Sequence, residues 1–165
     1  FSVCEKMNKL LLLSILLISS VADVYSQNLL NERIREIPGR KKSIYLEGGV
    51  FHGGSGTGRS TLVAARHSYR AAENFERLVF DFKGSSLPKV YGYLSEKEKK
   101  LYIDFFSSDL KPGISSFGNS KFVKNMDFFK ISSDTLSLEL GFKSKVSVDI
   151  FYLKSPSRLV IDVKN

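Results

Sequence analysis

The same short sequence pattern occurs twice in this chain, once near the middle and once close to the last residue. The two copies are Arg77–Phe82 (RLVFDF) and Arg158–Val163 (RLVIDV). Each is a run of apolar, β-branched and aromatic residues, which is typical of a buried β-strand. Residues two positions apart in a strand point to the same face, so the arginine and the aspartate of each copy share a face with the central valine.

The charges in the two copies also predict how the strands pair. If they run antiparallel with their central valines opposite each other, Arg77 faces Asp162 and Asp81 faces Arg158. Two cross-strand ion pairs of about 0.2–1 kcal/mol each would then fix the register. Two buried strands that share a pattern without pairing are the alternative.

The first 26 residues have the pattern of a secretory signal peptide. A cationic start at Met7–Lys9 precedes an uncharged run, Leu10–Ala22, and small or tolerated residues follow up to Ser26. We predict a start at Met7 and cleavage after Ser26, with Ala22 as the alternative site, and therefore a periplasmic or otherwise exported protein. The uncharged run is short for a membrane span of about 20 residues, so we expect no integral span after cleavage; an uncleaved anchor is the alternative.

Cysteine content and charge limit the chemistry of the exported part. Cys4 is the only cysteine and lies before the uncharged run, so we expect no disulfide, cysteine metal ligand or cysteine nucleophile. Residues 1–26 contain two basic and two acidic residues, and the remainder keeps the net charge of +8. Such a protein meets anionic polymers in a cell envelope, whereas export argues against nucleic acid. Plain solubility is the alternative, because the lysines are spread over the loops.

Period-two alternation of apolar residues dominates the chain from residue 43 onward. Residues 27–42 are interpreted as a tether, with a short helix ending near Glu36, and residues 43–165 as one β domain. We predict an all-β antiparallel sandwich of two small sheets, with one short helical turn within residues 68–74. The predicted strands cover residues 43–51, 61–68, 76–83, 89–94, 100–106, 122–132, 135–142, 146–153 and 158–163.

Motifs for catalysis are weak. Gly53–Ser60 has the spacing of a phosphate-binding loop but carries Arg59 in place of lysine, and the residues after it resemble a strand rather than a helix. His52 and His67 are the only histidines, too few for a typical zinc hydrolase. We therefore expect no cofactor, no metal and no catalytic residues.

Aromatic and cationic side chains are the candidates for ligand binding, because sugar rings stack on aromatic faces and cations pair with acidic groups. One cluster lies near the end of a predicted strand, and a pair of tyrosines alternates along another. Both could instead belong to the core face or to solvated surface. The predicted ligand-binding residues are Arg66, His67, Tyr69, Arg70, Tyr91 and Tyr93.

Three segments of the chain resemble a known family. Leu62–His67, Phe75–Phe82 and Phe151–Val163, in which Pro156 precedes the last strand, are similar to the AMIN domain of bacterial envelope proteins such as cell-wall amidases and secretins. The resemblance covers roughly residues 45–165. It implies a β-sandwich that binds peptidoglycan, or directs its host protein to a site in the envelope, without catalysis.

Two other functions remain open at this point. The domain could be an adaptor that adds a strand from an envelope protein to an exposed sheet edge. It could also be a zinc-dependent hydrolase of the wall, which the scarcity of metal ligands makes the weakest of the three.

Overall fold

The computed structural model describes residues 34–84 and 86–165. The predicted signal peptide and the first part of the predicted tether lie outside the described residues. The strands are β1 (Arg35–Glu36), β2 (Gly49–Gly53), β3 (Ser60–Arg70), β4 (Phe75–Lys83), β5 (Val90–Ser95), β6 (Lys100–Phe106), β7 (Ser108–Leu110), β8 (Val123–Lys130), β9 (Thr135–Phe142), β10 (Ser147–Leu153) and β11 (Arg158–Lys164).

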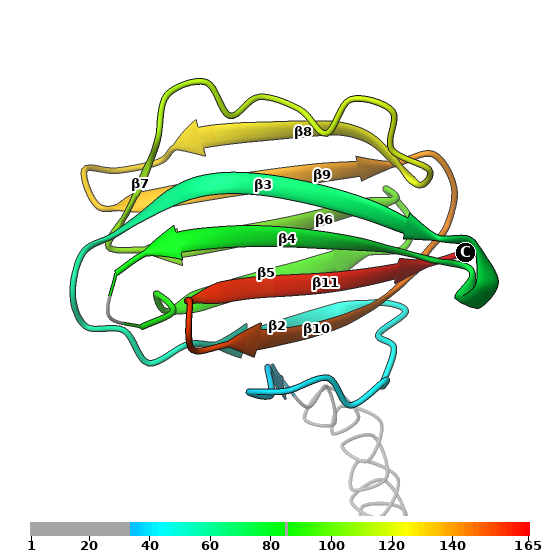
Figure 1. Ribbon diagram of the computed structural model, residues 1–165, viewed down its shortest axis with the longest axis horizontal. Coiled ribbons are helices and arrows are strands. Elements are labelled where there is room, and N and C mark those ends of the chain that lie inside the picture. Colours follow the sequence, from blue (N-terminus) through cyan, green and yellow to red (C-terminus); the bar gives the residue numbers. More distant parts are fainter. Residues whose placement is uncertain (1–33, 85) are drawn as a thin grey trace, which may run out of the picture. The chain divides into compact units, whose positions relative to one another are not determined.

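These strands form the predicted all-β sandwich. A six-stranded sheet has the order β1-β2-β5-β6-β9-β8, and a five-stranded sheet has the order β10-β11-β4-β3-β7. In Figure 1, β3, β4 and β11 run in front of β9, β6 and β5. The sheets are mixed rather than purely antiparallel, because β1 pairs parallel with β2 and β3 pairs parallel with β7. Within residues 34–84 and 86–165, no helix has the length and apolar character needed to span a membrane.

The two copies of the repeated strand pair in the predicted register. β4 and β11 are antiparallel neighbours, with Val79 opposite Val160, Arg77 opposite Asp162 and Asp81 opposite Arg158. This pair forms the centre of the five-stranded sheet, with β10 on one side and β3 on the other. The charge pattern of the sequence therefore predicted correctly that two strands about 80 residues apart in the chain pair with each other.

The core lies between the sheets and is filled by alternate residues of both. Leu78 and Phe80 of β4, Ile161 of β11 and Leu138 of β9 are at most 1% exposed. Phe82 of the five-stranded sheet packs against Phe105 of the other, with ring centroids 5.1 Å apart. Each buried aromatic ring removes about 150–250 Å² of apolar surface from water. The 13 phenylalanines of the chain, which has no tryptophan, therefore supply much of the buried apolar surface.

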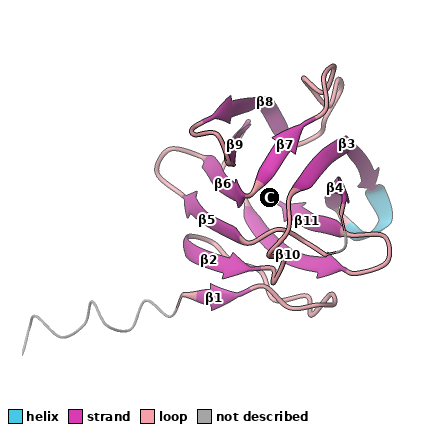
Figure 2. Cartoon of the chain, turned by 90° about the vertical axis from the view of Figure 1, so that its left-hand side faces the viewer, coloured by secondary structure: helices cyan, strands magenta, loops and turns pink. Residues whose placement is uncertain are grey.

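The described part of the predicted tether belongs to the β domain. Arg35–Glu36 form a strand rather than the end of a helix, and Ile37 is buried in the core at 3% exposure. The chain then crosses to the other sheet, where Leu46 exchanges two backbone hydrogen bonds with Val148. Residues 35–46, hereafter the strap, therefore close one side of the sandwich, and Figure 2 shows β1 beside β2 at the side away from β8. The sequence around Ile37 and Pro38 has no periodic pattern that would predict this packing.

A β-bulge in β3 decides which of its residues face outward. The register with β4 shifts between Leu62 and Ala64, so Val63 is the extra residue. Before the bulge Leu62 faces inward, and after it Ala65 and His67 face inward, opposite Phe80 and Leu78. A 3₁₀ turn, Ala71–Glu73, follows β3 where the sequence predicted a helical turn.

Candidate functional site

Tyr91 and Tyr93 point outward from β5, as the alternation of that strand allows. Their side chains are 43% and 45% exposed, whereas Val90 and Leu94 on the opposite face are buried. Gly92 lies between them on the inner face, where a Cβ atom would come within 2.1 Å of the Phe51 ring. The glycine lets the core close against β5, and the two tyrosines remain on the surface.

The neighbouring strand adds a third tyrosine. Tyr102 of β6 is directly opposite Tyr93, and its hydroxyl donates a hydrogen bond of 3.0 Å to the Glu98 carboxylate. Partial burial and this carboxylate raise the pKa of the Tyr102 hydroxyl, so it remains a neutral donor. Cross-strand neighbours on one face have Cβ atoms about 4.5–5.5 Å apart, so Tyr93 and Tyr102 are neighbours on this surface. Tyr91, Tyr93 and Tyr102 are hereafter called the tyrosine platform.

The same face continues with apolar side chains toward β8. Phe106, Phe129 and Ile131 are 41%, 49% and 67% exposed. Phe106 is paired with Thr135, which is hydrogen-bonded to Ile131 across the β8–β9 turn, and Phe129 is opposite Ser137. We call this surface of the six-stranded sheet the aromatic face; its members are Tyr91, Tyr93, Tyr102, Phe106, Phe129 and Ile131.

Two carboxylates lie among the side chains of the aromatic face. Asp104 is opposite Tyr91 and accepts a hydrogen bond from the Ser137 hydroxyl. Glu139 is opposite Tyr102 and forms a 2.5 Å ion pair with Lys100. Exposed aromatic rings beside carboxylate acceptors suit a ligand with flat apolar faces and hydroxyl or amide donors.

The outer face of the five-stranded sheet is organised differently, because its charges are paired with one another. Arg77 donates two hydrogen bonds to the fully buried Asp162, at 2.7 and 2.8 Å, and Lys41 of the strap lies 2.9 Å from the same carboxylate. Asp81 accepts two hydrogen bonds from Arg66 and one from Arg158. We call this network the charge ladder.

The strap covers part of the charge ladder and reduces the exposure of the ionisable groups Asp149 and Tyr45. Asp149 is directly opposite Asp162 and accepts a 3.0 Å hydrogen bond from the backbone N–H of Ser43. Burial, together with the neighbouring Asp162, raises the pKa of the Asp149 carboxyl. Burial and the same two carboxylates raise the pKa of the Tyr45 hydroxyl to about 12. Groups held this closely by their own neighbours act as structural elements.

The structure does not bring the six predicted ligand-binding residues together. Arg66 and Arg70 point outward from β3, whereas His67 and Tyr69 follow the bulge to the inner face. Arg66 is engaged with Asp81, and the 40% exposed Tyr69 packs edge-on against Phe122, with ring centroids 6.0 Å apart. The tyrosine pair lies on the opposite sheet. The predicted cluster around residues 66–70 is therefore not one surface.

His67 is part of a buried polar contact that stabilises a loop. Its Nδ1 lies 2.8 Å from a carboxylate oxygen of Glu76, which is fully buried. The same carboxylate accepts hydrogen bonds from the Ser120 hydroxyl and from the backbone N–H groups of Lys121 and Phe122. Burial opposes ionisation of Glu76, but these donors outweigh it and lower the pKa of its carboxyl. Ser120 donates to the carboxylate and not to His67, so the arrangement is not that of an activated serine nucleophile.

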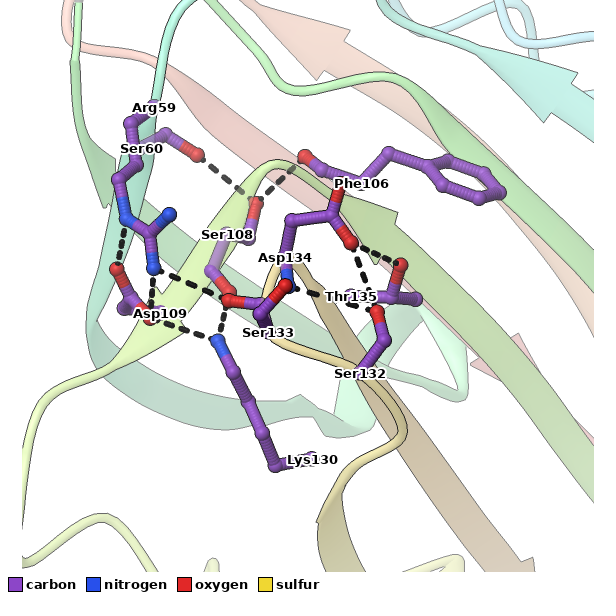
Figure 3. Close-up of polar contacts among 10 residues, drawn as sticks. All are labelled: Arg59, Ser60, Phe106, Ser108, Asp109, Lys130, Ser132, Ser133, Asp134 and Thr135. Carbon is purple, nitrogen blue, oxygen red and sulfur yellow. Dashed lines mark hydrogen bonds and ion pairs between the residues drawn. The ribbon is translucent and has the colours of Figure 1, made fainter.

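The glycine-rich segment also serves the fold. A strand, β3, begins at Ser60, where a phosphate-binding loop requires a helix; the sequence predicted a strand there. Arg59 donates hydrogen bonds of 2.5 and 2.9 Å to Asp109 of β7, which Lys130 of β8 also contacts at 2.7 Å (Figure 3). These two cations lower the pKa of the Asp109 carboxyl to about 2. This cluster connects the two sheets at the β7–β8 side.

Metal ligands do not gather in the part of the chain that the structure describes. Residues 34–84 and 86–165 contain no group of three or more histidine, cysteine, aspartate or glutamate side chains that could hold an ion.

The class of protein that the fold and the site define is an all-β sandwich with an exposed aromatic face. No protein-family model matches the chain. No curated protein matches it in sequence.

Proposed function

We propose that this protein is a non-catalytic binding module of the bacterial cell envelope, similar to AMIN domains, which binds peptidoglycan through the aromatic face. The observation that carries the proposal is the platform of Tyr91, Tyr93 and Tyr102 on an open sheet surface. Tyrosine is amphipathic: its ring stacks on the apolar face of a sugar, and its hydroxyl bonds to the polar edge. The export signal predicted from the sequence gives such a module access to the wall.

The composition of the face favours a glycan over an anionic polymer. Asp104 lies opposite Tyr91 and would repel phosphate or carboxylate groups placed directly over it, whereas Lys100 offsets the charge of Glu139. Both carboxylates would accept hydrogen bonds from the hydroxyl and N-acetyl amide groups of amino sugars. The net charge of +8 adds a long-range attraction to an acidic wall.

Retention on purified insoluble peptidoglycan tests this proposal. Wild-type protein should sediment with the polymer, and the double variant Tyr91→Ala/Tyr93→Ala should lose at least about tenfold in affinity, because ring stacking is worth about 1–3 kcal/mol per contact in comparable sites. The matched control is Tyr69→Ala, which removes an exposed tyrosine at the other sheet. Equal retention of all three proteins would refute a role for the aromatic face.

Strand addition at β8 is the second candidate, since β8 ends the six-stranded sheet and carries the exposed Phe129. Two features weaken this candidate. A register shift between Val123 and Asn125 interrupts the edge, and the side chain of Lys130 reaches across to the Ser108 carbonyl at 2.9 Å. Bulges and edge lysines are devices that block added strands. Binding to purified envelope proteins but not to peptidoglycan would favour this candidate over the first.

A further inference from the structure

An open cleft lies where the strap meets the end of β10. Its volume is about 580 Å³, and it opens widely to solvent. Four of the side chains that line it carry charge, and three of these are cationic. The charged residues are Glu36, Arg40, Lys42 and Lys154.

The strap supplies two of the cations on the same side of the chain. Lys41 points the other way, to Asp162 of the charge ladder at 2.9 Å, while Arg40 and Lys42 both line the cleft. Lys41 is thus held at the charge ladder, whereas its two neighbours in sequence, Arg40 and Lys42, lie at the cleft.

The frame of the cleft is held by backbone and ring contacts. The N–H of Tyr152 donates a 3.0 Å hydrogen bond to the carbonyl of Pro38. A Cβ atom at Gly39 would lie 3.3 Å from the Tyr152 ring, so any larger residue there would press on the ring. Ile37, next to this frame, is buried in the core. The cleft is therefore part of the folded domain.

The positive charge of the cleft is not neutralised internally among the described residues. Within residues 34–84 and 86–165, Arg40, Lys42 and Lys154 form no ion pair, and Glu36 is the one acidic side chain that lines the cleft. This differs from the charge ladder, where each arginine has a carboxylate partner at 3.1 Å or less. Several cations around one cavity, with an arginine able to form two parallel hydrogen bonds, favour an anionic oxygen group as ligand.

We propose that this cleft is an anion-binding site that takes a phosphate or carboxylate group. Glu36 of its lining is the strand partner of His52, and His52 is opposite Tyr91 of the aromatic face. Neighbouring strands are about 4.8 Å apart, so the cleft begins about 10 Å from Tyr91. If the proposed function holds, one envelope polymer can place its sugar rings on the aromatic face and an acidic substituent in the cleft.

NMR titration of the full chain with inorganic phosphate, and separately with acetate, tests the site at constant ionic strength. Saturable shifts are expected at the amides of residues 36–42 and 152–154. Arg40→Ala/Lys42→Ala should weaken binding at least about tenfold, since it removes two charge-assisted contacts. The matched control, Lys111→Ala/Lys124→Ala, removes the same charge from exposed positions beside β7 and on β8, at the sheet edges farthest from β10 and β1, and should bind as wild type.

The outcomes separate this site from the proposed function. Absence of saturation with both anions, or equal weakening in the control, would overturn the anion site even if peptidoglycan binding through the tyrosines holds. Saturation that depends on Arg40 and Lys42 would support it even if peptidoglycan binding fails. Sedimentation with vesicles of phosphatidylglycerol, compared with phosphatidylcholine, identifies the source of the anion. If the wild-type protein binds phosphatidylglycerol vesicles and Arg40→Ala/Lys42→Ala does not, the ligand is a lipid headgroup. If the wild-type protein binds phosphate or acetate but not these vesicles, the ligand is a soluble or wall-bound anion.

Discussion

The two outer faces of the sandwich use similar side chains for different purposes. On the five-stranded sheet, Phe151 is 4% exposed beneath Arg77, whose guanidinium carbon lies 5.6 Å from the ring centroid. On the six-stranded sheet, Tyr91 and Tyr93 are almost half exposed. The first face is covered by the strap and closed by its own ion pairs, so it contributes to stability. The second has no such cover in the described chain, so its rings remain in contact with solvent.

Replacing the covered aromatic residue gives the largest expected effect. Phe151→Ala should destabilise the domain by about 3 kcal/mol, because it removes a buried ring and leaves a cavity under Arg77. Chemical denaturation monitored by circular dichroism measures this loss. A cost below about 1 kcal/mol would show that the two faces do not differ as described.

A substitution in the charge ladder should have the second-largest effect on the free energy of unfolding. Asp162→Asn preserves the side-chain volume but leaves Arg77 and Lys41 without their carboxylate, at a cost of about 2 kcal/mol. Breaking a fully buried ion pair costs more free energy of unfolding, and the cost is lower here because Arg77 and Lys41 are both partly exposed. The variant also removes a like charge opposite Asp149, so the pKa of the Asp149 carboxyl should fall, which NMR titration can follow. An unchanged Asp149 titration would contradict the assigned coupling.

Glu76 sharpens the comparison because it lies on the same strand as the ladder but faces inward. Glu76→Gln should cost about 1–3 kcal/mol, since an amide cannot accept all the hydrogen bonds that the carboxylate receives. The folded-state pKa of this carboxyl is lowered, so its stabilisation is complete above the unfolded value of about 4.3 and is lost as the pH falls through the folded value. The difference in stability between wild type and variant should therefore shrink on acidification. A constant difference between pH 7 and pH 3 would argue against an ionised Glu76.

Substitutions of the exposed tyrosines should have the smallest effect on the free energy of unfolding. Tyr91→Ala and Tyr93→Ala should each change the free energy of unfolding by less than about 1 kcal/mol, because they remove only half-exposed rings and one cross-strand contact. The same denaturation experiments measure it. A loss as large as that of Phe151→Ala would place the tyrosines among the structural residues.

The sequence predicted the elements that follow from period-two patterning and from charge. The pairing of β4 with β11 followed from the spacing of Arg77 and Asp81 relative to their counterparts, because cross-strand charges specify register. Tyr102 and Phe106 could have been found in the same way, since Leu101 and Ile103 alternate with them as inner residues of β6.

Other features could not be predicted, for physical reasons. The bulge at Val63 reverses the alternation of β3, so His67 faces the core although simple alternation from Leu62 would turn it outward. The strap depends on the long-range pairing of Leu46 with Val148, which no local pattern encodes. β7 is three residues long and pairs in parallel with β3, too short for a periodic signal.

Chemical-shift mapping of the wild-type protein with soluble peptidoglycan fragments tests the central claim most directly. The account predicts shifts that centre on the ring and backbone signals of Tyr91, Tyr93 and Tyr102, with the signals of Asp81 and Asp162 unchanged. Shifts that centre on the charge ladder, or no saturable shifts at fragment concentrations in the millimolar range, would contradict it.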